Sequence, residues 1–147
     1  MTSPAFTLRT PTADDLPALF VVFKAAMRDY VTETYGPWDE DDQRQRFWTG
    51  FRLDHAKMIV ADGEIVGAID IERHDDRWHL HRIDIAPGWQ GRVIGTALIG
   101  DLIARARSES LPITLQVLRV NPARSLYRRL GFVEVGETDT HYQMRRG

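Results

Sequence analysis

The stretch Ile85-Ala86-Pro87-Gly88-Trp89-Gln90-Gly91-Arg92-Val93-Ile94-Gly95 decides which fold the chain can adopt. The β-branched run Ile83-Asp84-Ile85 predicts a strand, and Pro87-Gly88 ends it. Apolar spacing then predicts a helix within about six residues. Backbone N–H groups at the start of a helix have no acceptor inside it. A glycine-containing loop at this point is therefore typical of an anion-binding site.

Length and composition favour one globular domain. The 147 residues suffice for a hydrophobic core, and the chain is 43% hydrophobic and 27% charged. It has no cysteine, which excludes disulfides, thiol catalysis and cysteine-ligated metals. It shows neither a signal peptide nor an apolar run of roughly 20 residues. We therefore expect a cytoplasmic protein without a membrane segment.

Charge is distributed unevenly along the chain, although the formal net charge is only −2. Residues 1–90 contain 10 Lys and Arg against 16 Asp and Glu, whereas residues 91–147 contain 9 against 5. The small negative total argues against a general nucleic-acid-binding protein. The asymmetry is either chance on a solvated surface or a sign that the C-terminal part holds an anion and the N-terminal part attracts a cation.

Hydrophobic periodicity and turn residues predict an α/β (α+β) fold with the order β-α-α-β-β-β-α-β-α-β-β. Strands are predicted over residues 6–10, 57–61, 64–72, 77–86, 113–118, 132–135 and 141–144. Helices are predicted before the Gly36-Pro37 break, from Asp39 to about Arg52, over 92–108, and between Asn121-Pro122 and Gly131. This order is typical of a mixed sheet with helices on its faces.

Two segments in this order resemble the GCN5-related N-acetyltransferase (GNAT) superfamily. Residues 90–95, Gln-Gly-Arg-Val-Ile-Gly, are similar to its phosphate loop, Gln/Arg-x-x-Gly-x-Gly/Ala. Residues 121–132, Asn-Pro-Ala-Arg-Ser-Leu-Tyr-Arg-Arg-Leu-Gly-Phe, are similar to its second motif. Val93 replaces the first loop glycine, which keeps the N–H group but adds bulk near a phosphate. The resemblance implies a single N-acetyltransferase domain over residues 1–147.

The resemblance implies acetyl-coenzyme A as the donor and direct attack by a primary amine, either a small cationic amine or a lysine or N-terminal amine. Cofactor contacts are then expected from Ile83, Ile85, Gln90, Gly91, Arg92, Val93, Ile94, Gly95, Thr96, Asn121, Arg124 and Tyr127. A break in strand pairing at Ala86-Pro87 would free backbone N–H groups for the thioester carbonyl. Asn121 is also expected to cap its helix, and Arg124 or Arg128 either reaches the 3′-phosphate or stays solvated.

The amine must lose a proton before it attacks, which costs roughly 4–5 kcal/mol at pH 7. His79 and His81 alternate with Leu80 and so share one face of their strand. The resemblance to the arylalkylamine N-acetyltransferase branch implies that they relay this proton through water. Either histidine could instead be structural, and Glu72 is an alternative base. Arg82 and Asp84 point to the opposite face and are weaker candidates.

Tyr127 is expected to protonate the departing thiolate, a role that the resemblance implies. A phenol with a pKa of about 10 can give its proton to the conjugate base of a thiol with a pKa of about 8.5. Without the resemblance, the residue would be interpreted as a buried aromatic on an amphipathic helix.

Aromatic and acidic residues alternate in the segment 30–42. Aromatic faces and carboxylates together bind ammonium groups. The resemblance implies that this segment and the strand near His141 lie beside the acceptor slot, so we expect acceptor contacts from Tyr30, Glu33, Trp38, Glu72 and His141. A structural alternative is that Trp38 and Asp39 only form the start of the second helix.

No metal is expected. His74, His79 and His81 lie across a turn, and the chain lacks cysteines and a His-Glu-x-x-His helix.

The competing function is a non-catalytic acyl-coenzyme A sensor. A hydrolase would need a Gly-x-Ser-x-Gly or thiol nucleophile, which is missing. The sequence does not identify the acceptor amine. It also does not decide the oligomeric state, so whether the chain forms a homodimer is left open.

Overall fold

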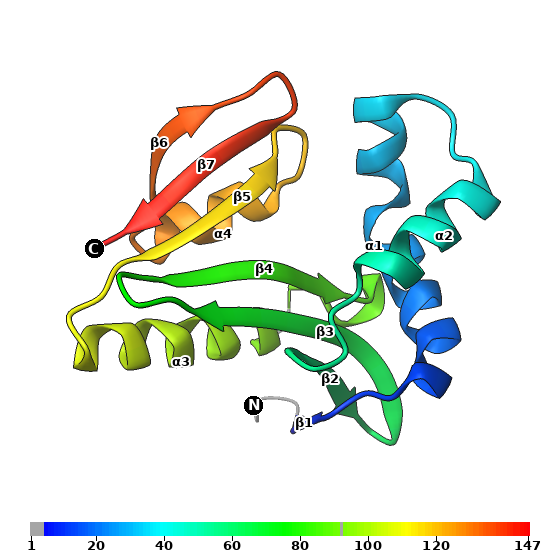
Figure 1. Ribbon diagram of the computed structural model, residues 1–147, viewed down its shortest axis with the longest axis horizontal. Coiled ribbons are helices and arrows are strands. Elements are labelled where there is room, and N and C mark those ends of the chain that lie inside the picture. Colours follow the sequence, from blue (N-terminus) through cyan, green and yellow to red (C-terminus); the bar gives the residue numbers. More distant parts are fainter. Residues whose placement is uncertain (1–4, 92) are drawn as a thin grey trace. The chain divides into compact units, whose positions relative to one another are not determined.

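The computed structural model describes residues 5–91 and 93–147, and the strands of this part form a mixed seven-stranded sheet with the order β1-β2-β3-β4-β5-β7-β6. The strands are β1 (Thr7–Arg9), β2 (Ala56–Ala61), β3 (Glu64–Arg73), β4 (Trp78–Ile85), β5 (Ile113–Leu118), β6 (Val133–Glu137) and β7 (His141–Arg146). The helices are α1 (Leu16–Tyr35), α2 (Glu40–Gly50), α3 (Ile94–Ser108) and α4 (Ala123–Arg129) (Figure 1).

The predicted order of strands and helices is confirmed. Short 3-10 segments, η1 (Ala13–Asp15) and η2 (Pro87–Trp89), were not predicted. None of the helices within the described residues has both the length and the apolar character required to cross a membrane. The chain divides into two compact units, and both β3 and β4 contribute to each of them.

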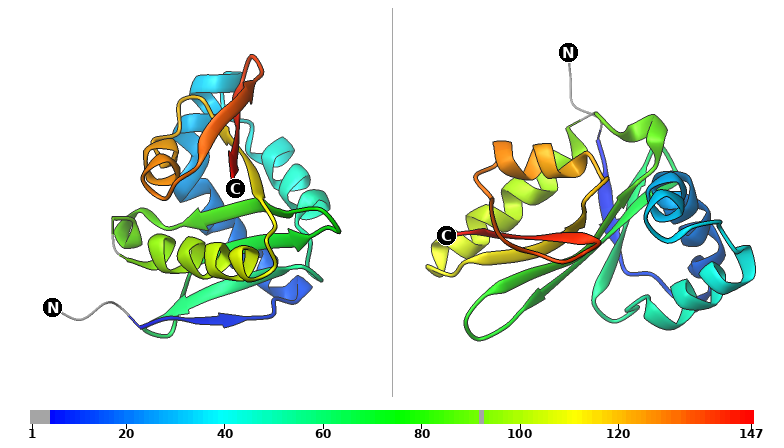
Figure 2. Two further views of the ribbon diagram at one scale, coloured as in Figure 1. Left: turned by 90° about the vertical axis from the view of Figure 1, so that its left-hand side faces the viewer. Right: turned by 90° about the horizontal axis from the view of Figure 1, so that it is seen from above.

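The first unit comprises residues 5–70 of the described chain together with Arg82–Gly95. Its strands β1, β2 and β3 pair antiparallel. Helices α1 and α2 lie side by side (Figure 2). Its core contains the buried side chains Leu16, Leu19, Phe20, Phe47, Phe51, Ala56, Met58 and Ala68. Burying this apolar surface stabilises two helices that would be marginal in isolation.

Turn and cap residues explain where α1 and α2 end and begin. Gly36 adopts φ +99°, a conformation that glycine tolerates, and so ends α1. Asp39 caps α2 by accepting a hydrogen bond from the Asp42 N–H at 3.1 Å, as its sequence position predicts. Gly36 and Asp39 therefore determine where the short connection between α1 and α2 begins and ends.

The second unit comprises Ile71–His81 and Thr96–Gly147. In it β5 pairs parallel with β4 and antiparallel with β7, and β6 pairs antiparallel with β7. Helices α3 and α4 lie on the same face of these strands (Figure 2). Its buried side chains include Leu102, Ile113, Leu115, Phe132 and Met144. The alternation of Ile113, Leu115 and Val117 along β5 matches the period of a strand with one fully covered face.

Gly67 marks a close approach of β3 to β4 in the first unit. A Cβ atom at this position would lie 2.2 Å from the carbonyl oxygen of Asp84. Real side chains do not come this near to a backbone atom, so only glycine allows the two strands their present spacing.

We expect Gly67→Ala to lower the free energy of unfolding by about 1–3 kcal/mol, because the strands must move apart. Gly100→Ala is the control: nothing lies within 4 Å of its Cβ position in α3. Alanine favours a helix over glycine by roughly 0.5–1 kcal/mol, so this variant should be more stable. Urea unfolding followed by circular dichroism measures both. A Gly67→Ala variant as stable as the parent would contradict the close approach.

Candidate active site

The loop between β4 and α3 carries the predicted phosphate motif. Gln90 donates from its side-chain amide to the carbonyl of Ile85 at 2.7 Å and so fastens the loop to the strand that it leaves. Gly91 adopts φ +73°, which glycine reaches at little cost. Helix α3 then begins at Ile94, which is fully buried. The first N–H groups of α3 therefore follow the loop directly, the arrangement that binds anions.

Val93, which stands where the family motif has its first loop glycine, has a side chain that is 43% exposed. Gly95 is buried and Thr96 is exposed at the first turn of the helix. The predicted contact Arg92 lies outside the described residues.

The pairing of β4 changes along its length. Its parallel ladder with β5 covers Trp78–Leu80 and Ile113–Leu115. The predicted carbonyl-binding residues Ile83 and Ile85 lie beyond that ladder. The sequence predicted a break at Ala86-Pro87, but the Ala86 N–H still donates to the carbonyl of Val66 at 2.8 Å. The predicted position of the break was therefore wrong, because Ala86 continues the hydrogen bonding to β3.

Helix α4 presents the second motif. The Asn121 side-chain oxygen accepts a hydrogen bond from the Ala123 N–H at 2.9 Å and so binds the first residue of the helix. The predicted N-cap was one residue too early, because Pro122 rather than Asn121 is the N-cap and α4 starts at Ala123. Tyr127 is 5% exposed, and its ring meets that of Phe132 edge to face at 5.8 Å. The ring is thus held in one orientation, as either a structural or an acid role requires.

Arg124 and Arg128 on α4 both have an anionic partner. Arg124 lies 3.4 Å from Glu134, and its guanidinium stacks on Tyr142 at 4.3 Å. Arg128 also pairs with Glu134. A phosphate at either arginine would compete with this carboxylate.

His79 and His81 lie together, as their spacing predicted. Their ring centroids are 4.5 Å apart, with an interplanar angle of 79°. The Nδ1 atom of His79 shares a hydrogen bond with the Thr114 hydroxyl at 2.7 Å. Burial lowers the pKa of His79, the neighbouring His81 and Arg77 lower it further, and its neutral form is thereby favoured. Glu72 Oε2 lies 3.6 Å from His81 Nε2.

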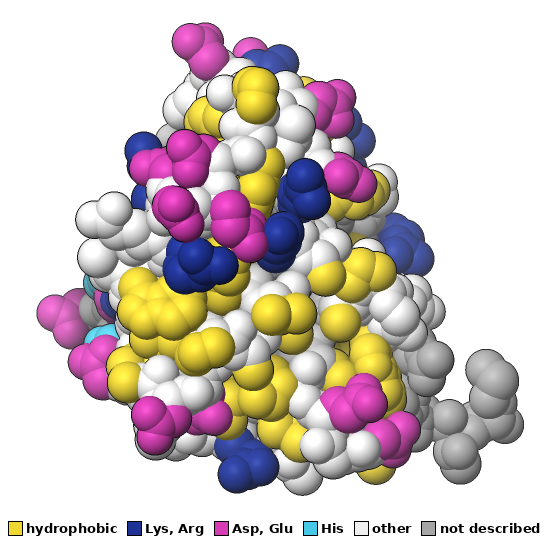
Figure 3. Space-filling view, turned by 90° about the vertical axis from the view of Figure 1, so that its right-hand side faces the viewer, with side chains coloured by type: hydrophobic (Ala, Val, Ile, Leu, Met, Phe, Trp, Pro, Cys, Tyr) yellow, Lys and Arg dark blue, Asp and Glu magenta, His cyan; other side chains and the backbone are white. Residues whose placement is uncertain are grey.

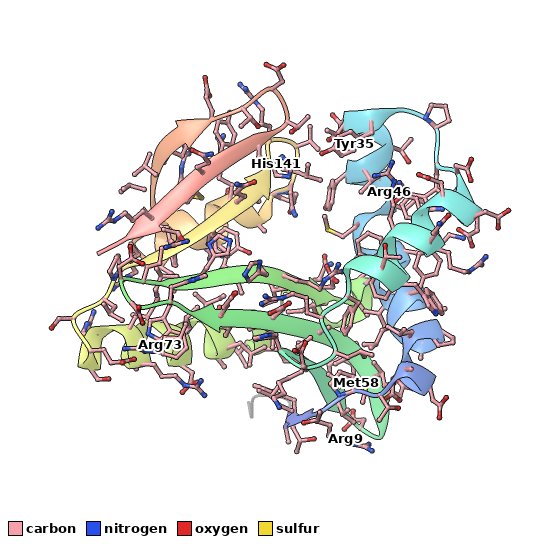
Figure 4. The ribbon with its side chains drawn as sticks, viewed as in Figure 1. Arg9, Tyr35, Arg46, Met58, Arg73 and His141 are labelled. Carbon is pink, nitrogen blue, oxygen red and sulfur yellow. The ribbon has the colours of Figure 1, made fainter. Side chains whose placement is uncertain are left out.

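The predicted acceptor residues differ in their surroundings. Trp38 stacks on Phe20 at 6.4 Å and donates to Glu40 at 2.7 Å, so it packs against the core of the first unit. Tyr30 is half-buried and Glu33 is exposed. His141 begins β7 and shares a hydrogen bond with the Thr140 hydroxyl at 2.8 Å (Figure 4).

Acidic residues after Tyr35 are largely paired. Lys24 binds Glu40 at 2.9 Å, Arg46 binds Asp42 at 2.8 Å, and Arg44 lies 3.4 Å from Asp41. Basic and acidic side chains lie interspersed on the face shown in Figure 3. The acidic surplus predicted for this segment is therefore partly neutralised within its own unit, which weakens its attraction for a cation.

Arg82 and Asp84 form an ion pair that sequence reasoning set aside. The Arg82 guanidinium lies 2.8 Å from Asp84 and 4.9 Å from the ring centroid of Phe47. Its distances to Phe23 and Phe51 are 5.3 and 5.4 Å. Burial raises the pKa of Asp84, and Arg82 opposes this rise. The two residues stand two positions apart on one strand, and this spacing could have predicted the ion pair. Nothing in the sequence indicated the second pair, Arg52 with Asp70 at 2.7 Å.

Asp84→Asn tests this buried pair through its pH dependence. Because the pKa is raised in the folded state, the folded protein binds this proton more tightly than the unfolded chain does. The stability that the proton provides is present below the ordinary aspartate pKa of about 3.9 and is lost as the pH rises through the folded value. Urea titrations at a series of pH values measure this effect. As the pH rises from about 3.9 through the raised folded pKa, we expect the free energy of unfolding of the wild type to fall relative to that of Asp84→Asn.

Asp54→Asn is the matched control, because the Asp54 side chain is 84% exposed. Its difference from the wild type should stay nearly flat over the same range. A wild type that gains stability relative to Asp84→Asn with rising pH would contradict the raised pKa.

The comparisons with known proteins agree with this arrangement. A family model described as the acetyltransferase (GNAT) family matches residues 23–132. The chain belongs to this family. The GNAT fold is also seen in the PaiA N-acetyltransferase from Thermoplasma acidophilum, solved in complex with coenzyme A. The two share 18% identity over 97% of this chain and 98% of that chain, with a TM-score of 0.73.

Two curated relatives match the GNAT chain over part of their length. Streptothricin acetyltransferase of Streptomyces lavendulae is 34% identical over 89 residues, which are 58% of this chain and 47% of that protein. The [ribosomal protein bS18]-alanine N-acetyltransferase of Haemophilus influenzae is 31% identical over 85 residues, which are 57% of this chain and 58% of that protein. The chain thus spans about half the length of the curated relatives that it matches.

Proposed function

We propose that this GNAT chain transfers an acetyl group from acetyl-coenzyme A to a primary amine. The observation that carries the proposal is the loop after β4, in which Gly91 has positive φ and which leads directly into the start of α3, where helix N–H groups bind anions. Family membership and the coenzyme A complex of a protein with the same fold support acetyl-coenzyme A as the donor. The backbone from Gly91 to Thr96 would bind its diphosphate.

The reaction is a direct displacement. The neutral amine nitrogen attacks the thioester carbonyl carbon, the carbon–sulfur bond breaks, and the thiolate accepts a proton. Tyr127 is the acid that we assign to the thiolate, because its phenol lies on the helix of the second motif. The proton of the amine passes to water and a base, for which His79, His81 and Glu72 are the candidates.

The acceptor belongs to the class of primary amines. The names of the two relatives give streptothricin and an alanine of ribosomal protein bS18 as the acceptors of those proteins. We therefore propose a small cationic amine or a peptide amine here. The exposed Glu33 and half-buried Tyr30 are our candidates for holding its ammonium group.

A non-catalytic sensor of acyl-coenzyme A is the alternative. The feature that favoured it was Val93 in the phosphate loop. The feature that favours the enzyme is Tyr127, a candidate acid on the helix of the second motif.

Thiol release from acetyl-coenzyme A, measured with a panel of amines, amino acids, polyamines and peptides at pH 7–8.5, tests the proposal. We expect release with at least one acceptor. Tyr127→Phe should keep its affinity for coenzyme A and lose at least about tenfold in kcat, because the thiolate then departs unprotonated. An unchanged kcat would contradict the acid role. Coenzyme A binding without release by any amine would favour the sensor.

A further inference from the structure

We propose that Glu72, His74 and His81 form a binding site for a divalent transition-metal ion of the zinc class. These three residues, called the hairpin cluster below, lie on the hairpin of β3 and β4 in the second unit. Glu72 and His81 are also candidate bases for the acyl transfer, but the test of the metal site measures zinc binding alone and uses neither acetyl donor nor amine.

The ligand atoms of the hairpin cluster converge. Glu72 Oε2 lies 3.6 Å from His74 Nε2 and 3.6 Å from His81 Nε2. All three residues offer a ligand atom within 4.8 Å of the other two. Tetrahedral bonds of about 2.0–2.1 Å place neighbouring ligand atoms about 3.3–3.4 Å apart. Small side-chain rotations therefore bring the cluster to the dimensions of a zinc site.

The backbone holds these ligands in place. Glu72 and His74 are two residues apart, which directs their side chains to the same side of an extended chain. The His74 N–H donates to the Arg77 carbonyl at 2.8 Å and closes the turn. The ring of His81 contacts the ring of His79, which is itself hydrogen-bonded to the Thr114 hydroxyl. A fixed backbone lowers the entropy cost of gathering three ligands around an ion.

The surrounding charges suit a cation. Arg73 donates to Glu109 at 2.8 and 2.6 Å, and Arg77 donates to Asp76 at 2.9 Å. These pairs neutralise the positive charges nearest to the cluster on the hairpin. Two imidazoles and one carboxylate are the protein donors found in zinc sites that keep an open position for water.

The cluster is accessible from solvent. The Glu72 side chain is 20% exposed, and the side chains of His74 and His81 are each 35% exposed. An ion can thus reach the three ligands without the hairpin opening. No metal was predicted, because His74, His79 and His81 were considered as one group of ligands. The fold brings Glu72 close to His74 and His81, whereas His79 hydrogen-bonds to Thr114.

Isothermal titration of the tag-free, metal-stripped protein with zinc chloride tests the site. We expect saturable binding of one ion per chain. His74→Ala should weaken it at least about tenfold, since loss of even a supporting partner has effects of this size. His55→Ala is the control, because His55 pairs with Asp54 in the first unit and should leave the affinity unchanged. Circular dichroism verifies that each variant is folded.

Glu72→Gln provides a second test should His74→Ala fail to fold, and it should weaken zinc binding by a similar factor. Absence of saturable zinc binding would overturn the site. So would His74→Ala or Glu72→Gln variants that bind zinc as tightly as the wild type. None of these results bears on thiol release, so the proposed acyl transfer stands or falls separately.

Discussion

The alternation of side chains along β4 is the constraint on which the rest of the structure depends. Successive residues of a strand point to opposite faces, so His79 and His81 share one side while Arg82 and Asp84 share the other. On the first side the two rings contact each other, and Glu72 lies next to His81. On the second, the ion pair of Arg82 with Asp84 lies against aromatic rings of the first unit. Strand β4 thereby contributes two histidines to a polar cluster on one side and an ion pair that contacts the core of the first unit on the other.

Backbone groups, more than basic side chains, account for the proposed cofactor site. Arg124 and Arg128 of α4 share the carboxylate of Glu134, so part of their charge is already neutralised. The loop after β4 instead relies on Gly91 in a left-handed conformation and on the start of α3. N–H groups aimed at one point bind a diphosphate without needing a net positive surface. This agrees with a chain whose formal net charge is −2.

Local patterns predicted most of the fold, and long-range pairings accounted for what was missed. The bounds of β5 agree with the alternation of its apolar residues, and Gly36 and Gly131 adopt the positive φ that their positions at helix ends predicted. By contrast, the pairs Arg52–Asp70 and Glu72–His81 join residues on different elements. They depend on strand register and chain path, which periodicity does not specify. The elements that carry the two motifs were therefore predictable, whereas the side-chain pairs between elements were not.

Amide NMR during titration with coenzyme A tests the central claim most directly, namely that the loop between β4 and α3 binds a diphosphate. The account predicts that the largest shifts occur at the backbone N–H groups of Gly91, Gly95 and Thr96. Pantetheine, which lacks the diphosphate, should leave these signals unmoved. Saturating coenzyme A that shifts other residues but not these three would contradict the account.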